Sequence, residues 1–92
     1  MEKNCLNKDV KLMFFHASWC GQCKAFTPIV RGAAQEAGVN IVDVDADKDL
    51  DICNAYGIMN LPVVIVVNGD KKERIDGIVS KEILLDKINS IK

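Results

Sequence analysis

The sequence predicts an α/β domain in which a βαβ unit is followed by a ββα unit, giving one four-stranded mixed sheet flanked by helices. Two observations support this fold class. Short apolar runs of strand length alternate with segments whose apolar residues recur at helical spacing. In addition, 49% of the 92 residues are hydrophobic and 27% are charged, which is the balance of a compact globule. A chain of this length builds one hydrophobic core, so we expect a single domain over residues 1–92.

The first strand is predicted at residues 11–16, and the helix after it runs from about Cys20 to Ala37. An apolar run of strand length precedes the helix, and Gly38 follows its last turn as a C-cap. Pro28 falls inside the helix, where a proline removes one backbone hydrogen bond. We therefore expect this helix to be kinked.

The second strand is predicted at residues 39–44. Because a long crossover containing a helix joins it to the first strand, the two strands should be parallel and the connection right-handed. A short helix over about residues 48–56 should follow, capped by Asp45 or Asp47. We expect its inward side to carry Leu50 and Ile52, with Cys53 as a third candidate, and Gly57 to end it.

Two further strands and a last helix complete the predicted sheet. Residues 63–67 are nearly all β-branched, as in a strand buried on both faces, and residues 73–78 form the fourth strand. Asn68 and Gly69 between them should supply the positive φ angles of a hairpin turn. Ser80 is expected to cap the last helix. The buried stripe of this helix should comprise Leu84, Ile88 and Ile91, and its solvent side Lys81, Asp86, Lys87 and Lys92.

The charge balance and the first residues exclude several classes of partner. Twelve basic and thirteen acidic residues give a net charge of −1, which favours neither nucleic acid nor an anionic lipid surface. Residues 1–11 lack the apolar core of a signal peptide, and the longest apolar run, residues 61–67, is too short to span a bilayer. We expect a monomeric cytoplasmic protein without nucleic-acid or membrane partners, in which most thiols stay reduced.

Cys20 and Cys23 stand three residues apart where the first strand gives way to the first helix. The unpaired N–H groups and the partial positive charge of a helix N-terminus favour a thiolate, so Cys20 should be the more acidic thiol and the nucleophile. Cys23 lies one turn further on the same side, where it can resolve a disulfide that Cys20 makes.

Three kinds of site use this spacing of cysteines. A structural disulfide across so short a loop would contribute only about 2 kcal/mol. A zinc site needs four ligands, and the other candidates, which are carboxylates, His16, Cys5 and Cys53, include no second close pair. The context of a strand followed by a helix favours a redox pair over both alternatives, and we expect no bound metal or cofactor.

The residues around this pair resemble the thioredoxin family. The matches in order and spacing, which run from about residue 11 to the C-terminus, are residues 15–24, Thr27-Pro28, Tyr56-Gly57-Ile58, Leu61-Pro62, Asn68-Gly69 and Gly77. The resemblance implies a thioredoxin fold. Thioredoxins usually carry a further strand and a full helix before the active-site strand, for which this sequence has no room, so we expect an N-terminally trimmed version.

The resemblance implies a thiol-disulfide oxidoreductase, and more narrowly a protein-disulfide reductase. The Cys20–Cys23 pair would reduce disulfide-bearing protein substrates through a mixed disulfide, without a cofactor. A thioredoxin-reductase-type electron donor would then reduce the pair again. The alternative is a binding or scaffold module that keeps the fold and the peptide groove but has slow or no turnover.

The resemblance also assigns roles to the residues beside the cysteines. Gly21 permits the tight start of the helix, and Gln22 takes the place of the proline that most thioredoxins carry, which should make the pair less reducing. Trp19 should form an apolar rim of the site, although a lone tryptophan in a small domain ordinarily fills the core.

The predicted substrate groove lies before the third strand. The resemblance implies a cis peptide bond before Pro62, whereas most prolines in folded proteins follow a trans bond. The substrate would pair, as in strand addition, with the backbone of Met59, Asn60 and Leu61. Gly77 would keep the facing wall of the groove low.

Two departures from the family concern proton transfer. Thioredoxins usually bury an aspartate in the first strand and pair it with a lysine of the next strand, and we expect Phe14 and Ile41 at these positions. His16 shares a strand face with Phe14 and lies two residues nearer the cysteines, so it is the candidate to move the Cys23 proton. The alternative is a packed aromatic residue that makes one hydrogen bond.

The two remaining cysteines, Cys5 and Cys53, have no close cysteine neighbour in the sequence. We expect Cys53 to be a small packed residue of its helix and Cys5 to be exposed. The alternative for both is a regulatory role.

Overall fold

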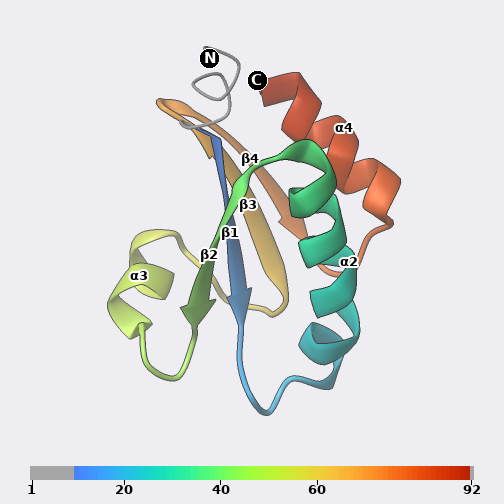
Figure 1. The fold of residues 1–92 in the computed structure, drawn as a ribbon. Coiled ribbons are helices and arrows are strands. Elements are labelled where there is room, and N and C mark those ends of the chain that lie inside the picture. The colour runs from blue at the N-terminus through green and yellow to red at the C-terminus, as the bar shows by residue number, and fades with distance from the viewer. Residues whose placement is uncertain (1–9, 92) are drawn as a thin grey trace.

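Seven elements make up the part of the chain that the structure, a computed structural model, describes, which is residues 10–91 (Figure 1). In chain order they are β1 (Val10–His16), α2 (Gly21–Ala37), β2 (Asn40–Asp45), α3 (Leu50–Ala55), β3 (Val63–Asn68), β4 (Lys71–Asp76) and α4 (Lys81–Ile91). The strands form one sheet in the order β2-β1-β3-β4, with β1 and β2 parallel and the other two pairs antiparallel. This is the mixed α/β sheet that the sequence predicts.

Helices cover both faces of the sheet, so the central strands are buried between two layers (Figure 1). α2 and α4 lie together on one face, and α3 lies on the other. Because side chains alternate along β1, Leu12 and Phe14 pack in the layer of α2 and α4, whereas Met13 and Phe15 pack on the side of α3. The first four residues of β3 are buried, which agrees with their β-branched sequence.

The layer of α2 and α4 supplies the larger core. Phe26 of α2 meets Phe14 edge-on, with the ring centroids 6.0 Å apart and an interplanar angle of 83°. Ser80 Oγ accepts a hydrogen bond from the N–H of Ile83 at 3.3 Å, so the predicted cap of α4 is confirmed. The predicted stripe of Leu84, Ile88 and Ile91 is buried in the same cluster. On the opposite side Lys81 and Asp86 are exposed, Lys87 is half-buried, and Lys92 lies outside the described residues.

α2 begins and ends as the sequence predicts. Cys20 is its N-cap, and Gly38 follows its last turn with φ 71°, the left-handed conformation that favours glycine. Pro28 lies inside the helix, and the hydroxyl of Thr27 just before it donates to the carbonyl oxygen of Cys23 at 2.8 Å. This bond adds a side-chain contact to the first turns, next to the proline. At 17 residues α2 is the longest described helix, and none of the described helices is long and apolar enough to cross a membrane.

The start of α3 differs from the prediction. The helix begins at Leu50, its N-cap is Asp49, and the side chain of Asp49 makes no capping hydrogen bond. The two predicted caps act in the turn before the helix instead, where Asp45 Oδ1 accepts a hydrogen bond from the N–H of Asp47 at 2.8 Å. The Asp45 carboxylate is engaged in this turn and the Asp47 carboxylate accepts a hydrogen bond from Trp19, so neither Asp45 nor Asp47 caps α3.

The buried side of α3 also differs from the prediction. Cys53 is buried, whereas Leu50 is 60% exposed and Ile52 is exposed as well. The expectation that Leu50 and Ile52 point inward is therefore wrong. The physical reason is length, since a helix of six residues makes less than two turns and presents few positions to the sheet. Gly57, with φ 64°, follows the end of the helix as predicted.

The hairpin between β3 and β4 differs in one detail. Of the residues that the structure describes, only glycines have a positive φ, and in this turn it is Gly69, at 62°. Asn68 belongs to β3 instead, so the expectation of a positive φ there is wrong. Its side chain donates from Nδ2 to the carbonyl oxygen of Ile91 at 2.6 Å, which ties the end of α4 to the sheet.

β4 starts and ends two residues earlier than predicted. It runs over Lys71–Asp76 and not over residues 73–78. Gly77 takes φ 85°, a left-handed conformation that ends the extended strand, so Ile78 lies beyond it and is exposed.

Candidate active site

Cys20 and Cys23 form a disulfide at the N-terminus of α2, with their Cα atoms 5.3 Å apart. The loop before them closes through a hydrogen bond from the N–H of Cys20 to the carbonyl oxygen of Ala17 at 3.1 Å. The Cys20 sulfur accepts a hydrogen bond from the N–H of Cys23 at 3.2 Å, so it occupies the capping position of the helix. At this position the helix N-terminus stabilises negative charge on the sulfur once the disulfide is reduced.

The two cysteines differ in their exposure to solvent. Cys20 is 8% exposed and Cys23 is 2% exposed, so both are buried but Cys20 is the one that opens to the surface. Leu61 and two alanines pack around the pair. An incoming disulfide therefore meets Cys20 first, which supports the order of attack predicted for the two cysteines.

Trp19 forms an exposed rim beside the disulfide and does not fill the core. It is 69% exposed, and its Nε1–H donates to Asp47 Oδ1 at 2.9 Å. This hydrogen bond holds the indole against the turn between β2 and α3, 28 residues away along the chain. Sequence patterns do not reveal this role of Asp47, because nothing in its local sequence indicates a contact with Trp19.

A pocket of about 240 Å³ opens between Trp19 and α3. Most of its lining is apolar, including Leu50, Met59 and Leu61, and Asp47 lines it as well. Leu50 and Met59 are large apolar side chains that the fold leaves exposed. Such residues, when they gather around one pocket beside a reactive disulfide, indicate a surface for binding another molecule.

The loop before β3 packs against the disulfide. The peptide bond between Leu61 and Pro62 is cis, as the family resemblance implies, and Leu61 packs against the cysteine pair. Pro62 is buried, and its carbonyl oxygen accepts a hydrogen bond from the N–H of Gly77 at 2.9 Å. Within the described part of the chain, no backbone hydrogen bond engages residues 59–61. Their N–H and C=O groups are therefore available to an extended segment.

The other residues predicted around the site lie at its border. Gly21 and Gln22 form the first turn of α2 and are both exposed. No atom lies within 4 Å of the point where a Cβ would project from Gly77, so the space beside it is open. The positive φ of Gly77 gives a second reason for glycine there, independent of any bound molecule.

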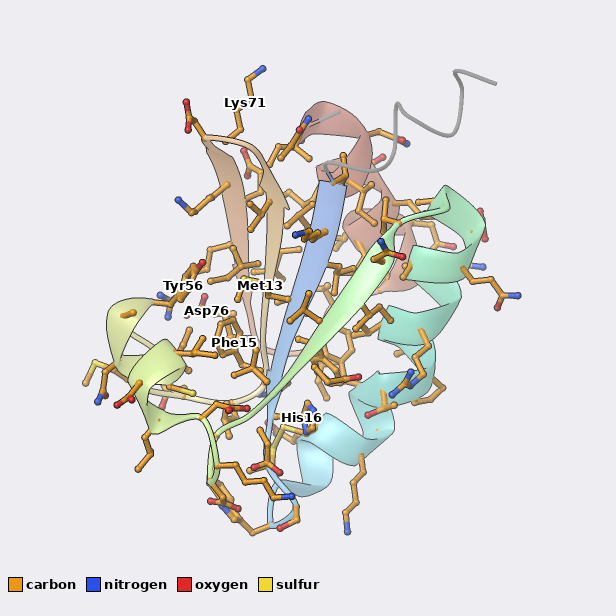
Figure 2. The ribbon with its side chains drawn as sticks, turned by 60° about the vertical axis from the view of Figure 1, so that its left-hand side comes forward. Met13, Phe15, His16, Tyr56, Lys71 and Asp76 are labelled. Carbon is orange, nitrogen blue, oxygen red and sulfur yellow. A yellow bond between two sulfur atoms is a disulfide. The ribbon has the colours of Figure 1, made fainter. Side chains whose placement is uncertain are left out.

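His16 lies at the end of β1, where the chain turns toward the start of α2 (Figure 2). Its ring centroid is 5.0 Å from that of Phe14, and its side chain is 29% exposed. Nε2 of His16 lies 3.5 Å from Oδ1 of Asp43, and the other carboxylate oxygen of Asp43 lies 3.6 Å from the guanidinium of Arg31. The histidine therefore packs on one aromatic ring and also belongs to a charged group between β2 and α2.

The residue across from Phe14 on β2 is Asp43 and not Ile41. In the parallel register of β1 and β2, Phe14 pairs with Asp43 and Leu12 pairs with Ile41. Phe14 is buried, as predicted, but the expectation of an apolar partner for it on β2 is wrong. Sequence spacing across a helical crossover leaves the strand register open, so the hydrogen-bonded sheet alone decides which residue stands there.

Cys53 is a buried free thiol on the α3 side of the sheet, packed in one cluster with Phe15. Burial raises its pKa, and the carboxylates of Asp49 and Asp45 raise it further, so the thiol stays protonated at neutral pH. This agrees with the packing role predicted for Cys53, whereas Cys5 lies outside the described residues. Over residues 10–91, no three His, Cys, Asp or Glu side chains come together as metal ligands.

Comparison with known proteins gives one consistent result. The thioredoxin family model matches residues 2–90. Thioredoxins from Rickettsia felis and Bacillus subtilis are each 34% identical to this chain, over 96% and 90% of its length and 88% and 83% of theirs. A mutant thioredoxin from Halobacterium salinarum has a similar structure, with a TM-score of 0.84 and 26% identity over 98% of this chain and 80% of that one. The structure of Fasciola hepatica thioredoxin gives a TM-score of 0.81 at 26% identity, over 99% and 89% of the two chains.

The site and the comparisons lead to the same conclusion by separate routes. The similarity extends over nearly the whole chain, and the disulfide stands at the position that the family uses for its chemistry. This chain therefore belongs to the thioredoxin family and is a thiol-disulfide oxidoreductase whose active-site pair is Cys20 and Cys23.

Proposed function

We propose that this chain is a protein-disulfide reductase in which Cys20 attacks the substrate and Cys23 resolves the intermediate. The observation that carries the proposal is the asymmetry of the pair. The Cys20 sulfur caps α2 and is the more exposed of the two, whereas Cys23 lies one turn inside the helix and is almost fully buried. A nucleophile needs both a stabilised thiolate and access, and Cys20 has both.

Each turnover transfers one electron pair from the dithiol to a substrate disulfide. The Cys20 thiolate attacks one substrate sulfur, the substrate S–S bond breaks, and the first substrate thiolate leaves and takes up a proton. Cys23 then loses its proton and attacks the Cys20 sulfur of the mixed disulfide. This step releases the second substrate thiol and leaves the oxidised Cys20–Cys23 pair.

The substrate segment binds in extended form between the cis-proline loop and the rim of the site. The backbone groups of residues 59–61 pair with it, as a strand pairs with a sheet edge. Trp19, Leu50 and Met59 supply the apolar contacts, and the open space at Gly77 lets the segment approach closely. Backbone pairing suits many sequences, so this groove fits a reductase with several protein substrates.

His16 accepts the Cys23 proton in this proposal. β1 and α2 run in opposite directions (Figure 1), and the ring of Phe14 on β1 contacts that of Phe26 on α2. His16 follows Phe14 by two residues, and Cys23 precedes Phe26 by about one helical turn. His16 therefore lies near the level of Cys23. Ala17, the residue after His16, packs in one cluster with both cysteines. An imidazole ordinarily changes charge between about pH 5 and 8, and a partly exposed ring can exchange a proton through one water molecule.

The electrons come from a donor of the thioredoxin-reductase type, and the substrates are disulfide-bearing proteins of the cytoplasm. The support is similarity to thioredoxins over most of both chains. The reductase would attack the same Cys20–Cys23 disulfide from the open side of the site, so donor and substrate use one surface in turn. The chain acts as a monomer in this proposal.

Insulin reduction by dithiothreitol tests the proposed activity. We expect the protein to accelerate the precipitation of reduced insulin and the double variant Cys20→Ser/Cys23→Ser to have no effect. Cys23→Ser alone should accumulate a mixed disulfide with the substrate, whereas Cys20→Ser should not. Peptide binding without any acceleration would show a binding or scaffold module and would overturn the proposal.

A further inference from the structure

Asp43 joins two basic side chains beside the active site. One of its carboxylate oxygens faces Nε2 of His16 on β1, and the other faces the guanidinium of Arg31 on α2. The Asp43 side chain is 45% exposed, so it can also contact water. The carboxylate is therefore contacted from two elements at once, β1 and α2, and lies level with Phe14 in the register of the sheet.

We propose that Asp43 is a positioning residue that prepares His16 to move the Cys23 proton. The inference rests on the role proposed above for His16. A neutral imidazole carries its proton on one nitrogen and accepts a proton only at the other. Because the Asp43 carboxylate lies 3.5 Å from Nε2, its negative charge favours the tautomer with the proton on that nitrogen, which leaves the lone pair on Nδ1.

The proton then follows a closed path during resolution. When Cys23 attacks the mixed disulfide, its proton passes through water to Nδ1 of His16, and the ring becomes an imidazolium. Asp43 stabilises this positive charge, and Arg31 holds the second carboxylate oxygen in place. The imidazolium finally gives the proton to the departing substrate thiolate, so the histidine returns to its neutral form.

The other groups around His16 do not replace Asp43. Asp45 is the register partner of His16, but its carboxylate accepts a backbone hydrogen bond in the turn toward α3. Lys24 shares a side of α2 with Arg31, because seven residues make about two turns, and it adds only positive charge there. On the β3 side the pairing with β1 ends at Phe15 and Val63, one residue before His16, and Val63 is uncharged.

Stopped-flow reaction with a small aromatic disulfide separates the two steps. Its first coloured thiol is released when Cys20 attacks, and its second when Cys23 resolves the mixed disulfide. The comparison uses His16→Phe, Asp43→Ala, both changes together, and Glu73→Ala as a matched control. Glu73 is a strand carboxylate, 41% exposed, that pairs with Lys87 of α4 at 3.4 Å, and it lies on β4, the outer strand at the opposite edge of the described sheet from β2.

We expect the second release to respond and the first to stay unchanged. His16→Phe should slow the second release about a hundredfold, the lower end of what general acid–base catalysis contributes. Asp43→Ala should slow it roughly two- to five-fold, as expected for a partly exposed charge pair. The double variant should be no slower than His16→Phe, because Asp43 acts only through the ring. Glu73→Ala should leave both releases unchanged.

A nitrogen NMR spectrum reports which nitrogen of the His16 ring carries the proton. This tautomer would not change on substitution of Asp43 if Asp43 had only a structural role. In the parent protein at high pH the ring proton should sit on Nε2, and Asp43→Ala should allow both tautomers. If the melting temperature shows that Asp43→Ala damages the fold, Asp43→Asn, which keeps the shape and removes the charge, takes its place.

Three outcomes would contradict the proposals, and they are distinguishable. If His16→Phe leaves the second release unchanged, the proton role of His16 fails and the inference about Asp43 falls with it. If His16→Phe slows this release but Asp43→Ala does not, only the inference is wrong. If the two effects multiply in the double variant, Asp43 acts on the cysteines independently of His16, and the positioning role is overturned.

Discussion

The two faces of the sheet differ in how completely their apolar side chains are buried. Under α2 and α4 they are buried in a continuous core, with the rings of Phe14 and Phe26 in contact. On the α3 face a smaller cluster is buried, and Leu50 and Met59 remain exposed around a pocket beside Trp19. Long helices cover a sheet completely, whereas a helix of six residues leaves apolar surface for another molecule. The first face thus supplies stability, and the second leaves exposed the apolar surface to which the proposed substrate would bind.

The largest effect that this comparison predicts is on stability. Leu84→Ala removes a fully buried side chain from the α4 face and should lower the free energy of unfolding by about 3 kcal/mol. Leu50→Ala, the same change on the α3 face, should alter it by less than about 0.5 kcal/mol. Urea denaturation of both variants checks this. Equal losses would mean that the two faces do not differ in the way described.

The second prediction concerns recognition. Trp19→Ala should lower kcat/KM for a protein disulfide roughly tenfold, since an exposed aromatic residue at the rim of a pocket is the type that dominates binding. Its effect on the free energy of unfolding should stay below about 1 kcal/mol. Reduction of a small aromatic disulfide, which lacks the extended peptide segment of a protein substrate, serves as the control. A similar loss with both substrates would place the defect in the chemistry and not in binding.

The third prediction compares the N-terminal caps of α4 and α3. Ser80→Ala removes the hydrogen bond to the N–H of Ile83 and should cost about 1 kcal/mol of unfolding free energy. Asp49→Ala removes no capping bond from α3 and only the long hydrogen bond, 3.3 Å, that Asp49 Oδ2 accepts from the N–H of Asp45, so it should cost less. The same urea experiment measures both. A larger loss for Asp49→Ala would show that α3 depends on its first residue more than its geometry indicates.

The smallest predicted effect is a pH dependence of the unfolding free energy that arises from Cys53 on the α3 face. Burial and two carboxylates raise the pKa of Cys53, so the folded protein holds this proton at pH values where the unfolded chain has lost it. The resulting stability is fully present below the ordinary thiol pKa of about 8.5 and is lost as the pH rises through the higher folded value. The unfolding free energy of the parent should therefore fall more steeply above about pH 8 than that of Cys53→Ala. If the unfolding free energy falls equally with pH in the parent and in Cys53→Ala, the raised pKa of Cys53 is contradicted.

Long elements could be predicted from the sequence because their patterns repeat. The apolar spacing of α2 extends over several turns and ends at Gly38. The β-branched residues of β3 form a short continuous run, which favours a strand. α3 is too short for such a repeat, so the expectation from apolar spacing that Leu50 points inward is wrong. Local signals fix long segments well and short ones poorly.

The cysteine pair could be located from spacing, and the cis bond before Pro62 from resemblance to a family. Neither the spacing nor the family resemblance predicts which side chains contact each other around the cysteine pair. The hydrogen bond from Trp19 to Asp47 and the pairing of His16 with Asp43 join residues brought together by the sheet. They depend on strand register across a crossover, which no local pattern encodes.

β2 is the outer strand on one side of the sheet that the structure describes, and this position gives its aspartates a further consequence. An outer strand offers its backbone groups to any chain that can add to it, which is a common route to aggregation. Asp43 and Asp45 both lie on β2, so a second copy meeting it along this strand would bring carboxylates together. Such an addition is opposed by charge. The carboxylate of Asp43, 3.5 Å from Nε2 of His16, is one of the two charges that would oppose it.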